Sequence, residues 1–110
     1  MTDKSQDSMN ISTSRQGDTV VVTLTGELDL HSSELLAASV DEALATAPSV
    51  VEIDADALTF ADSAGLRSLL SAREAAEQHG TTLRLGRVSA PLGRLLDMTG
   101  LREVFEFAAG

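Results

Sequence analysis

The sequence predicts an α/β fold of two layers: a mixed, mostly parallel sheet of four to five strands, with helices covering one face. Two observations support this class. Segments with strand periodicity alternate with segments of helical periodicity, which favours right-handed crossovers and parallel strands. Within each strand, apolar residues alternate with Thr, Glu, Asp or Arg. A sheet covered on both faces would have strands that are apolar throughout, so we expect one face to be left to solvent or to a partner.

The first element predicted is a β-hairpin over residues 10–26. Two short strands flank residues 15–18, where Gly17 can adopt the positive φ of a tight turn. The second strand has one clearly more apolar side, formed by Val20, Val22 and Leu24. Residues 1–9 are polar and show no periodic pattern. The sequence therefore predicts a flexible arm over 1–9, followed by one domain over 10–110.

A helix and a further strand are predicted after the hairpin. The helix is capped by Ser32 or Ser33 and ends before Pro48. Its apolar face consists of Leu36, Val40, Ala43, Leu44 and Ala47. A strand over 49–54 turns Val51 and Ile53 to one face and its two acidic residues to the other. A loop over 55–62 then leads to the next helix.

The second half of the chain contains two more helices. One begins at about residue 63 and ends near Gly80, with a stripe formed by Leu66, Leu69, Leu70 and Ala76. A strand over 81–86 follows it. The last helix starts near Ser89, has Pro91 in its first turn and ends by Gly100. Residues 102–107 are expected to form a short edge strand.

Composition excludes several classes of function. Eight basic and seventeen acidic residues give a formal net charge of −9, which repels nucleic acids and anionic membrane surfaces. The chain has no cysteine, so it can form neither disulfides nor thiolate metal sites. It contains neither a signal peptide nor an apolar run of the roughly 20 residues that span a bilayer. We therefore expect a cytoplasmic protein without nucleic-acid or membrane partners.

The stretch FADSAGLRSLL, residues 60–70, places Ser63 at the N-cap or in the first turn of the second helix. As an N-cap, its hydroxyl would satisfy a free backbone N–H, and its loss would cost about 1 kcal/mol. Asp62 can fill the same role. The neighbours Ala61, Ala64 and Gly65 are small, so the hydroxyl is easy to approach. Ser63 can therefore be either a structural cap of the helix or an accessible hydroxyl with a function.

Catalysis by Ser63 itself is disfavoured because no base is at hand. The nucleophile elbow G-x-S-x-G fails at Ala61. His79 lies at the far end of the same helix, roughly 20 Å away, and His31 is expected to be a solvated loop residue. A small hydrolase or nucleotide-binding enzyme is thus the least favoured hypothesis. The more coherent chemistry is that another enzyme acts on Ser63 as its substrate.

No metal or cofactor site is predicted. Asp54, Asp56 and Asp62 do not fit an EF-hand, because Leu58 and Thr59 stand at its fifth and sixth positions and no glutamate stands at its twelfth. The glycine-rich motifs that bind nucleotide phosphates or dinucleotides are absent from the sequence.

Three motifs resemble the STAS domain of bacterial anti-sigma factor antagonists: TGELDLHSSELL, LTFADSAGLRSLL and PLGRLLDMTGLREVF. The resemblance covers the chain from Asn10 onward. It departs from the family at Ala64, where many relatives have Ser or Thr, and at Leu95, where an aromatic residue is common. The first departure removes a rival hydroxyl beside Ser63.

The resemblance implies a regulatory protein rather than an enzyme. Such proteins bind an anti-sigma factor that is a serine kinase of the histidine-kinase-like ATPase type, and thereby free a sigma factor in stress response or sporulation. The kinase phosphorylates the serine that corresponds to Ser63, and a PP2C-like phosphatase reverses the modification. The alternative is a STAS scaffold subunit of a larger signalling assembly.

The partner surface implied by the family surrounds the start of the second helix and the loop over 27–33. Phe60 is instead expected to fill the core, because the chain has only three aromatic residues. The partner-binding residues predicted are Leu58, Asp62, Ser63, Ala64, Gly65 and Arg67, together with Asp29 and His31.

Overall fold

The structure is a computed structural model that describes residues 9–108. Its elements are β1 (Met9–Gln16), β2 (Thr19–Leu28), α1 (Ser33–Leu44), β3 (Val50–Ala61), α2 (Ser63–Gln78), β4 (Thr82–Val88), α3 (Ala90–Thr99), the short 3₁₀ helix η2 (Arg102–Val104) and β5 (Glu106–Phe107). The predicted arm lies outside the described residues except for Met9. That residue begins β1 and is buried, so its assignment to the arm is wrong.

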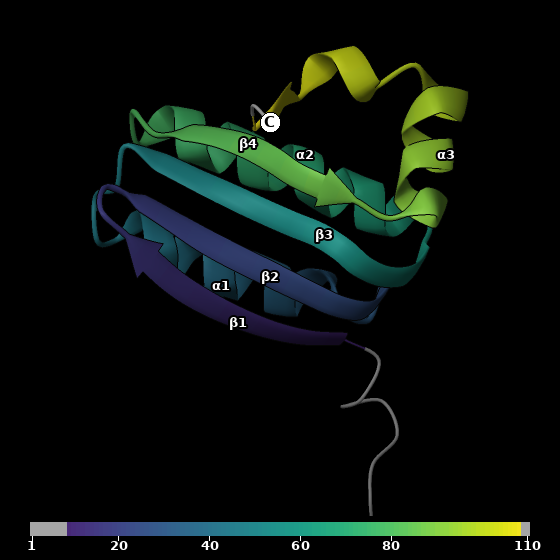
Figure 1. Cartoon of the computed structure of the whole chain (residues 1–110), viewed down its shortest axis with the longest axis horizontal. Helices are drawn as coiled ribbons and strands as arrows, with labels where there is room; N and C mark the ends of the chain where they lie inside the picture. The colour runs from purple at the N-terminus through teal and green to yellow at the C-terminus, as the bar shows by residue number, and fades with distance from the viewer. Residues whose placement is uncertain (1–8, 109–110) are drawn as a thin grey trace, which may run out of the picture.

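The five strands form one sheet in the order β1-β2-β3-β4-β5. β1 pairs with β2 in antiparallel orientation, and the remaining neighbours are parallel. Both α1 and α2 lie behind the sheet in Figure 1, while α3 lies beyond the carboxyl end of β4. The predicted fold class, a mixed and mostly parallel sheet with helices on one face, is confirmed.

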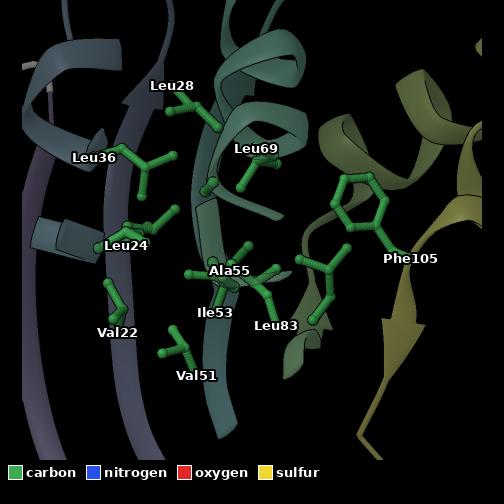
Figure 2. Close-up of a cluster of buried hydrophobic side chains, with 14 of the residues drawn as sticks. Val22, Leu24, Leu28, Leu36, Val51, Ile53, Ala55, Leu69, Leu83 and Phe105 are labelled. Carbon is green, nitrogen blue, oxygen red and sulfur yellow. The ribbon is translucent and has the colours of Figure 1, made fainter. Parts of the chain in front are cut away.

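The core fills the space between the sheet and its two covering helices, as Figure 2 shows. Inward positions of the three central strands alternate with outward ones, as the sequence predicts. The open face carries polar pairs instead, including Arg84 and Glu52 at 2.9 Å on adjacent strands. The side chains that form the centre of the core are Val22, Leu24, Leu36, Val51, Ile53, Leu69, Leu83 and Leu85.

The tight turns agree with the prediction. Gly17 has a φ of 63° between β1 and β2, which is the left-handed conformation that a glycine adopts without strain. α3 begins with Ser89 as its N-cap and is followed by Gly100 at a φ of 72°. The predicted edge strand in the tail is confirmed as well, although it is confined to β5.

Two boundaries differ from the prediction. α1 ends at Leu44, so Ala47 is exposed and lies outside the apolar face, with a φ of 57°. β3 continues to Ala61 through the segment that we expected to be a loop. Its pairing with β2 shifts register twice in this part, and the alternation of buried and exposed residues is lost after Ala55. The alternation of apolar and polar residues therefore predicts an end of β3 that is too early.

The core analysis generates a stability prediction. Leu85→Ala should lower the free energy of unfolding by about 2–5 kcal/mol, because the side chain is fully buried and its loss leaves a cavity. Leu30→Ala is the matched control, since Leu30 is 69% exposed and should change stability by at most about 0.5 kcal/mol. Urea denaturation followed by circular dichroism measures both. Equal losses in the two variants would contradict this description of the core.

Candidate functional site

Two connections meet at the carboxyl ends of β2 and β3. These strands are parallel neighbours, and Leu28 pairs with Ala61 at the point where both end. Residues 29–32 lead from β2 to α1, while Asp62 alone joins β3 to α2. Because parallel strands end at the same edge of a sheet, the GELD and DSAGL motifs are brought side by side.

Asp62, rather than Ser63, caps α2. The Asp62 Oδ1 atom accepts a hydrogen bond from the backbone N–H of Gly65 at 2.9 Å. Ser63 is the first residue of the helix and is exposed. Within residues 9–108, its hydroxyl makes no hydrogen bond to another group. The interpretation of Ser63 as the cap is therefore wrong, and its hydroxyl is left available to a partner.

Gly65 brings the first turn of α2 against the end of β2. A Cβ atom at this position would lie 2.3 Å from the carbonyl oxygen of Leu28, well inside any real contact. The same carbonyl accepts the backbone N–H of Asp62 at 3.2 Å. Gly65 is buried, so its predicted contact with a partner is wrong. Its missing side chain serves the packing that places Asp62 and Ser63.

The connection from β2 to α1 is ordered by Asp29 and Ser32. The Ser32 backbone N–H donates to Asp29 Oδ1 at 3.1 Å, and the Asp29 backbone N–H donates to Ser32 Oγ at 2.9 Å. Ser32 Oγ also donates to the carbonyl of Glu27 at 2.9 Å, while the Ser33 hydroxyl donates to the carbonyl of Asp29. Ser32 holds the N-cap position of α1, but its hydroxyl is turned into this loop and does not cap. The predicted capping of α1 by a serine side chain is thus wrong.

The remaining predicted contact residues separate by exposure. His31 and Arg67 are exposed, and Ala64 and Asp62 are half-buried. Leu58 is only 2% exposed, so its prediction as a partner contact is wrong. Phe60 shows the opposite error. We expected it in the core, but it is 45% exposed.

Leu30 is an exposed residue that the sequence reasoning missed. It is 69% exposed and stands one residue beyond Asp29 in the connection between β2 and α1. Its only signal in the sequence is its position between two polar residues just after a strand. Phe60, near the carboxyl end of β3, is a second large apolar side chain that is exposed close to this edge of the sheet.

The site is acidic and contains one cation. Glu27 at the end of β2, Asp29 and Asp62 in the two connections and Glu34 in the first turn of α1 are acidic. Arg67 is the only Lys or Arg in residues 27–34 and 58–67. Outside the site, hydrogen bonds lower the pKa of two carboxyl groups. The hydrogen bond from Ser49 lowers the pKa of Asp18, and the one from Arg102 lowers the pKa of Asp97.

The described residues give no sign of a metal or of a serine nucleophile with its base. Residues 9–108 contain no cluster of three or more His, Cys, Asp or Glu that could hold a metal ion. His79 lies sixteen residues along α2 from Ser63, about 24 Å at 1.5 Å per residue, and its Nδ1 lies 2.9 Å from the carbonyl oxygen of Ala75. Over the same residues, no helix has the length and apolar character required to cross a membrane.

Comparison with known families agrees with this arrangement. The model of the family described as "Mlab, STAS domain" matches residues 11–106, which include both connections and all of α2. The chain belongs to the STAS domain family. The resemblance noted in the three motifs is thereby confirmed, and the fold described above is that of a STAS domain.

Relatives of this STAS domain carry a consistent description. An anti-sigma F factor antagonist of Paenibacillus polymyxa is 34% identical over 86 residues, covering 77% of this chain and 74% of the relative. The crystal structure of an anti-sigma factor antagonist from Mycobacterium paratuberculosis superimposes with a TM-score of 0.82 at 24% identity, covering 94% of this chain and 88% of that one. The structure of the Bacillus cell fate determinant SpoIIAA in its phosphorylated form gives a TM-score of 0.68 at 24% identity. The match covers 91% of this chain and 92% of that one.

The capping geometry generates a second prediction. Asp62→Ala should lower the free energy of unfolding by about 0.5–2 kcal/mol, because it removes the acceptor for the Gly65 N–H. Ser63→Ala should stay within about 0.5 kcal/mol of the wild type, since its hydroxyl stabilises nothing in the fold. Thermal and urea unfolding of the two single variants measure this difference. A larger loss for Ser63→Ala than for Asp62→Ala would mean that the serine is the true cap.

A third prediction tests the close approach at Gly65. Gly65→Ala should destabilise the domain by about 1–3 kcal/mol, because the new methyl group meets backbone atoms of Leu28 that cannot swing aside. Gly93→Ala in α3 is the matched control. There the methyl group would meet the end of the flexible Arg102 side chain at 3.2 Å and the Val88 side chain at an ordinary 3.9 Å, and alanine favours a helix. Equal stability changes in both variants would refute the packing constraint at Gly65.

Proposed function

We propose that this STAS domain is an anti-sigma factor antagonist whose binding to an anti-sigma factor is switched off by phosphorylation of Ser63. The observation that carries the proposal is the state of the Ser63 hydroxyl. It is exposed at the edge of the sheet where the connections that follow β2 and β3 meet. Asp62, rather than Ser63, caps α2. A kinase can therefore modify the Ser63 hydroxyl without breaking a hydrogen bond that holds the fold.

Similarity to described proteins supports the general function. The Paenibacillus polymyxa relative is named as an anti-sigma F factor antagonist. A second relative in fold, the Bacillus determinant SpoIIAA, is described in a phosphorylated form. For this chain, we propose an anti-sigma factor that is itself a serine kinase of the histidine-kinase-like ATPase type. A PP2C-like phosphatase would restore the free serine, and the exchange would take place in the cytoplasm.

The chemistry of the switch follows from charge. A phosphate on Ser63 adds about −1.5 to −2 charges beside Asp62, on a chain whose formal charge is already −9. The positive end of the α2 dipole offsets this by about 0.3–1 kcal/mol, and at most about 2 kcal/mol, so the domain stays folded. A partner that covers Ser63 must desolvate the dianion. A penalty of about 4 kcal/mol weakens binding roughly a thousandfold.

The proposed partner surface follows the exposed residues around Ser63. Asp62, Ala64 and Arg67 on the α2 side and His31 on the α1 side remain in it from the sequence prediction. Leu58 and Gly65 are buried and are left out of this surface. Leu30 and Phe60, which are exposed, are added to it as apolar contact residues. Asp29 contributes indirectly, because its hydrogen bonds with Ser32 order the loop that contains Leu30.

The proposal predicts distinct behaviour for wild type, Ser63→Ala and Ser63→Glu. Each variant is used to capture proteins from a lysate of the native organism, and the captured proteins are identified by mass spectrometry. Wild type and Ser63→Ala should retain an ATPase-type serine kinase that Ser63→Glu loses. After incubation of the isolated chain with that kinase and ATP, intact mass should show one added phosphate on wild type and none on Ser63→Ala.

Two results would count against the switch. Phosphate incorporation into Ser63→Ala would move the acceptor to another residue. Equal retention of the same partners by all three variants would show that the state of Ser63 does not control binding, and would favour a STAS scaffold subunit of a larger signalling assembly. Size-exclusion chromatography of the free chain then discriminates further, because a constitutive scaffold should not run as an 11.5 kDa monomer.

A further inference from the structure

A groove of about 360 Å³ runs between α1 and α2 on the helical side of the sheet. It starts beside the candidate site, where Leu30 and Ala64 line it, and continues along both helices to Asp41 and Ala75. Ala64 directly follows Ser63 in α2, so the groove begins at the proposed phosphorylation site. The two helices pack against each other beneath it.

Small side chains predominate in the groove. Alanines and serines make up more than half of its lining residues, and the buried Val40 and Ala72 line it as well. The backbone of an incoming helix can therefore approach closely between the charged side chains. The stretch from Ala64 to Ala75 measures about 16 Å along α2 at 1.5 Å per residue, which is about three helical turns. This is the shape that a short amphipathic helix occupies when it binds in a groove.

The charges on the two walls differ in sign. Glu34 and Asp41 line the α1 wall, about 10 Å apart along that helix, whereas Arg67 lines the α2 wall near the mouth. None of the three belongs to an ion pair formed within residues 9–108. A complementary helix carries two basic residues seven positions apart on one flank and an acidic residue on the other, with small or aliphatic residues between them.

We propose that this groove docks an amphipathic helix of the anti-sigma factor, with its basic flank against Glu34 and Asp41. The inference rests on the proposed function and extends the contact surface from the neighbourhood of Ser63 along the length of α1. It also assigns a role to Leu30, whose exposed side chain lines the groove together with Ala64. A phosphate on Ser63 then stands at the end of the docked helix.

The test compares residues that line the groove with neighbours on the same helix. Ala37→Phe fills the groove, and Ala38→Phe is its control, because Ala38 is also exposed on α1 but does not line the groove. Isothermal titration with the anti-sigma factor identified by capture measures the dissociation constants, and circular dichroism confirms folding. Ala37→Phe should weaken binding at least tenfold, whereas Ala38→Phe should stay within twofold of the wild type.

Charge reversal provides a second variant, which tests the sign of the charge on the α1 side of the groove. Asp41→Lys should weaken binding at least threefold at low salt and less at high salt, while Glu42→Lys, outside the groove on the same helix, should have the smaller effect. A benzophenone amino acid introduced at position 37 should crosslink to a helical segment of the anti-sigma factor that contains Lys or Arg. Crosslinking to a second copy of this chain would overturn the assignment.

The outcomes separate this inference from the proposed function. If Ser63→Glu abolishes binding while Ala37→Phe and Asp41→Lys bind like the wild type, the switch stands and the groove assignment is wrong. If Ala37→Phe and Ala38→Phe lose affinity equally, the groove is again wrong, because a specific cavity would distinguish them. If the wild-type chain binds no anti-sigma factor, both proposals fail together.

Discussion

The candidate site depends on the close approach between the first turn of α2 and the carboxyl end of β2. Gly65 permits it, since a Cβ atom there would lie 2.3 Å from the Leu28 carbonyl oxygen. The same oxygen accepts the N–H of Asp62, so the chain is tied to β2 just before the helix begins. With this contact, β2, β3 and α2 meet at one point, and Ser63 emerges from it facing outward.

Some polar groups around this point form hydrogen bonds within the fold, whereas others are exposed on the surface. Asp62 satisfies the Gly65 N–H, and Asp29 and Ser32 satisfy each other within the neighbouring connection. No buried side-chain nitrogen or oxygen of the described residues lacks a hydrogen-bond partner. The fold therefore stabilises itself without the Ser63 hydroxyl, the guanidinium of Arg67 or the exposed side chain of Leu30. Those groups remain available for recognition.

The sequence predicts the fold well because the fold rests on periodicity. Alternation in β2 and β4 and the helical stripe of α2 identify the inward faces correctly, and glycines mark the turns. Prediction fails where the backbone breaks its period. The register shifts between β2 and β3 bury Leu58 and turn Phe60 outward, the reverse of what we expected for the pair. A bulge changes which residues face inward without any change in residue type.

At the site, the sequence singles out candidate residues without deciding the role of each one. The DSAGL motif contains two residues able to cap α2, and their side chains alone do not decide between them. The decision comes from the backbone: Asp62 has the extended conformation of an N-cap, whereas Ser63 is already helical. The groove between α1 and α2 is likewise a property of two helices packed together, which the pattern of either helix alone does not reveal.

Capping by Asp62 has a consequence for how the switch can work. If the Ser63 hydroxyl were the cap, phosphorylation would alter a bond that stabilises α2, and signalling would be coupled to unfolding. With Asp62 in that role, the proposed phosphate on Ser63 would change the charge of the surface and leave the helix intact. A small domain with one core has little stability to lose. In the proposed switch, separating the cap from the residue that is modified would let the domain alternate between two charge states while its packing stays the same.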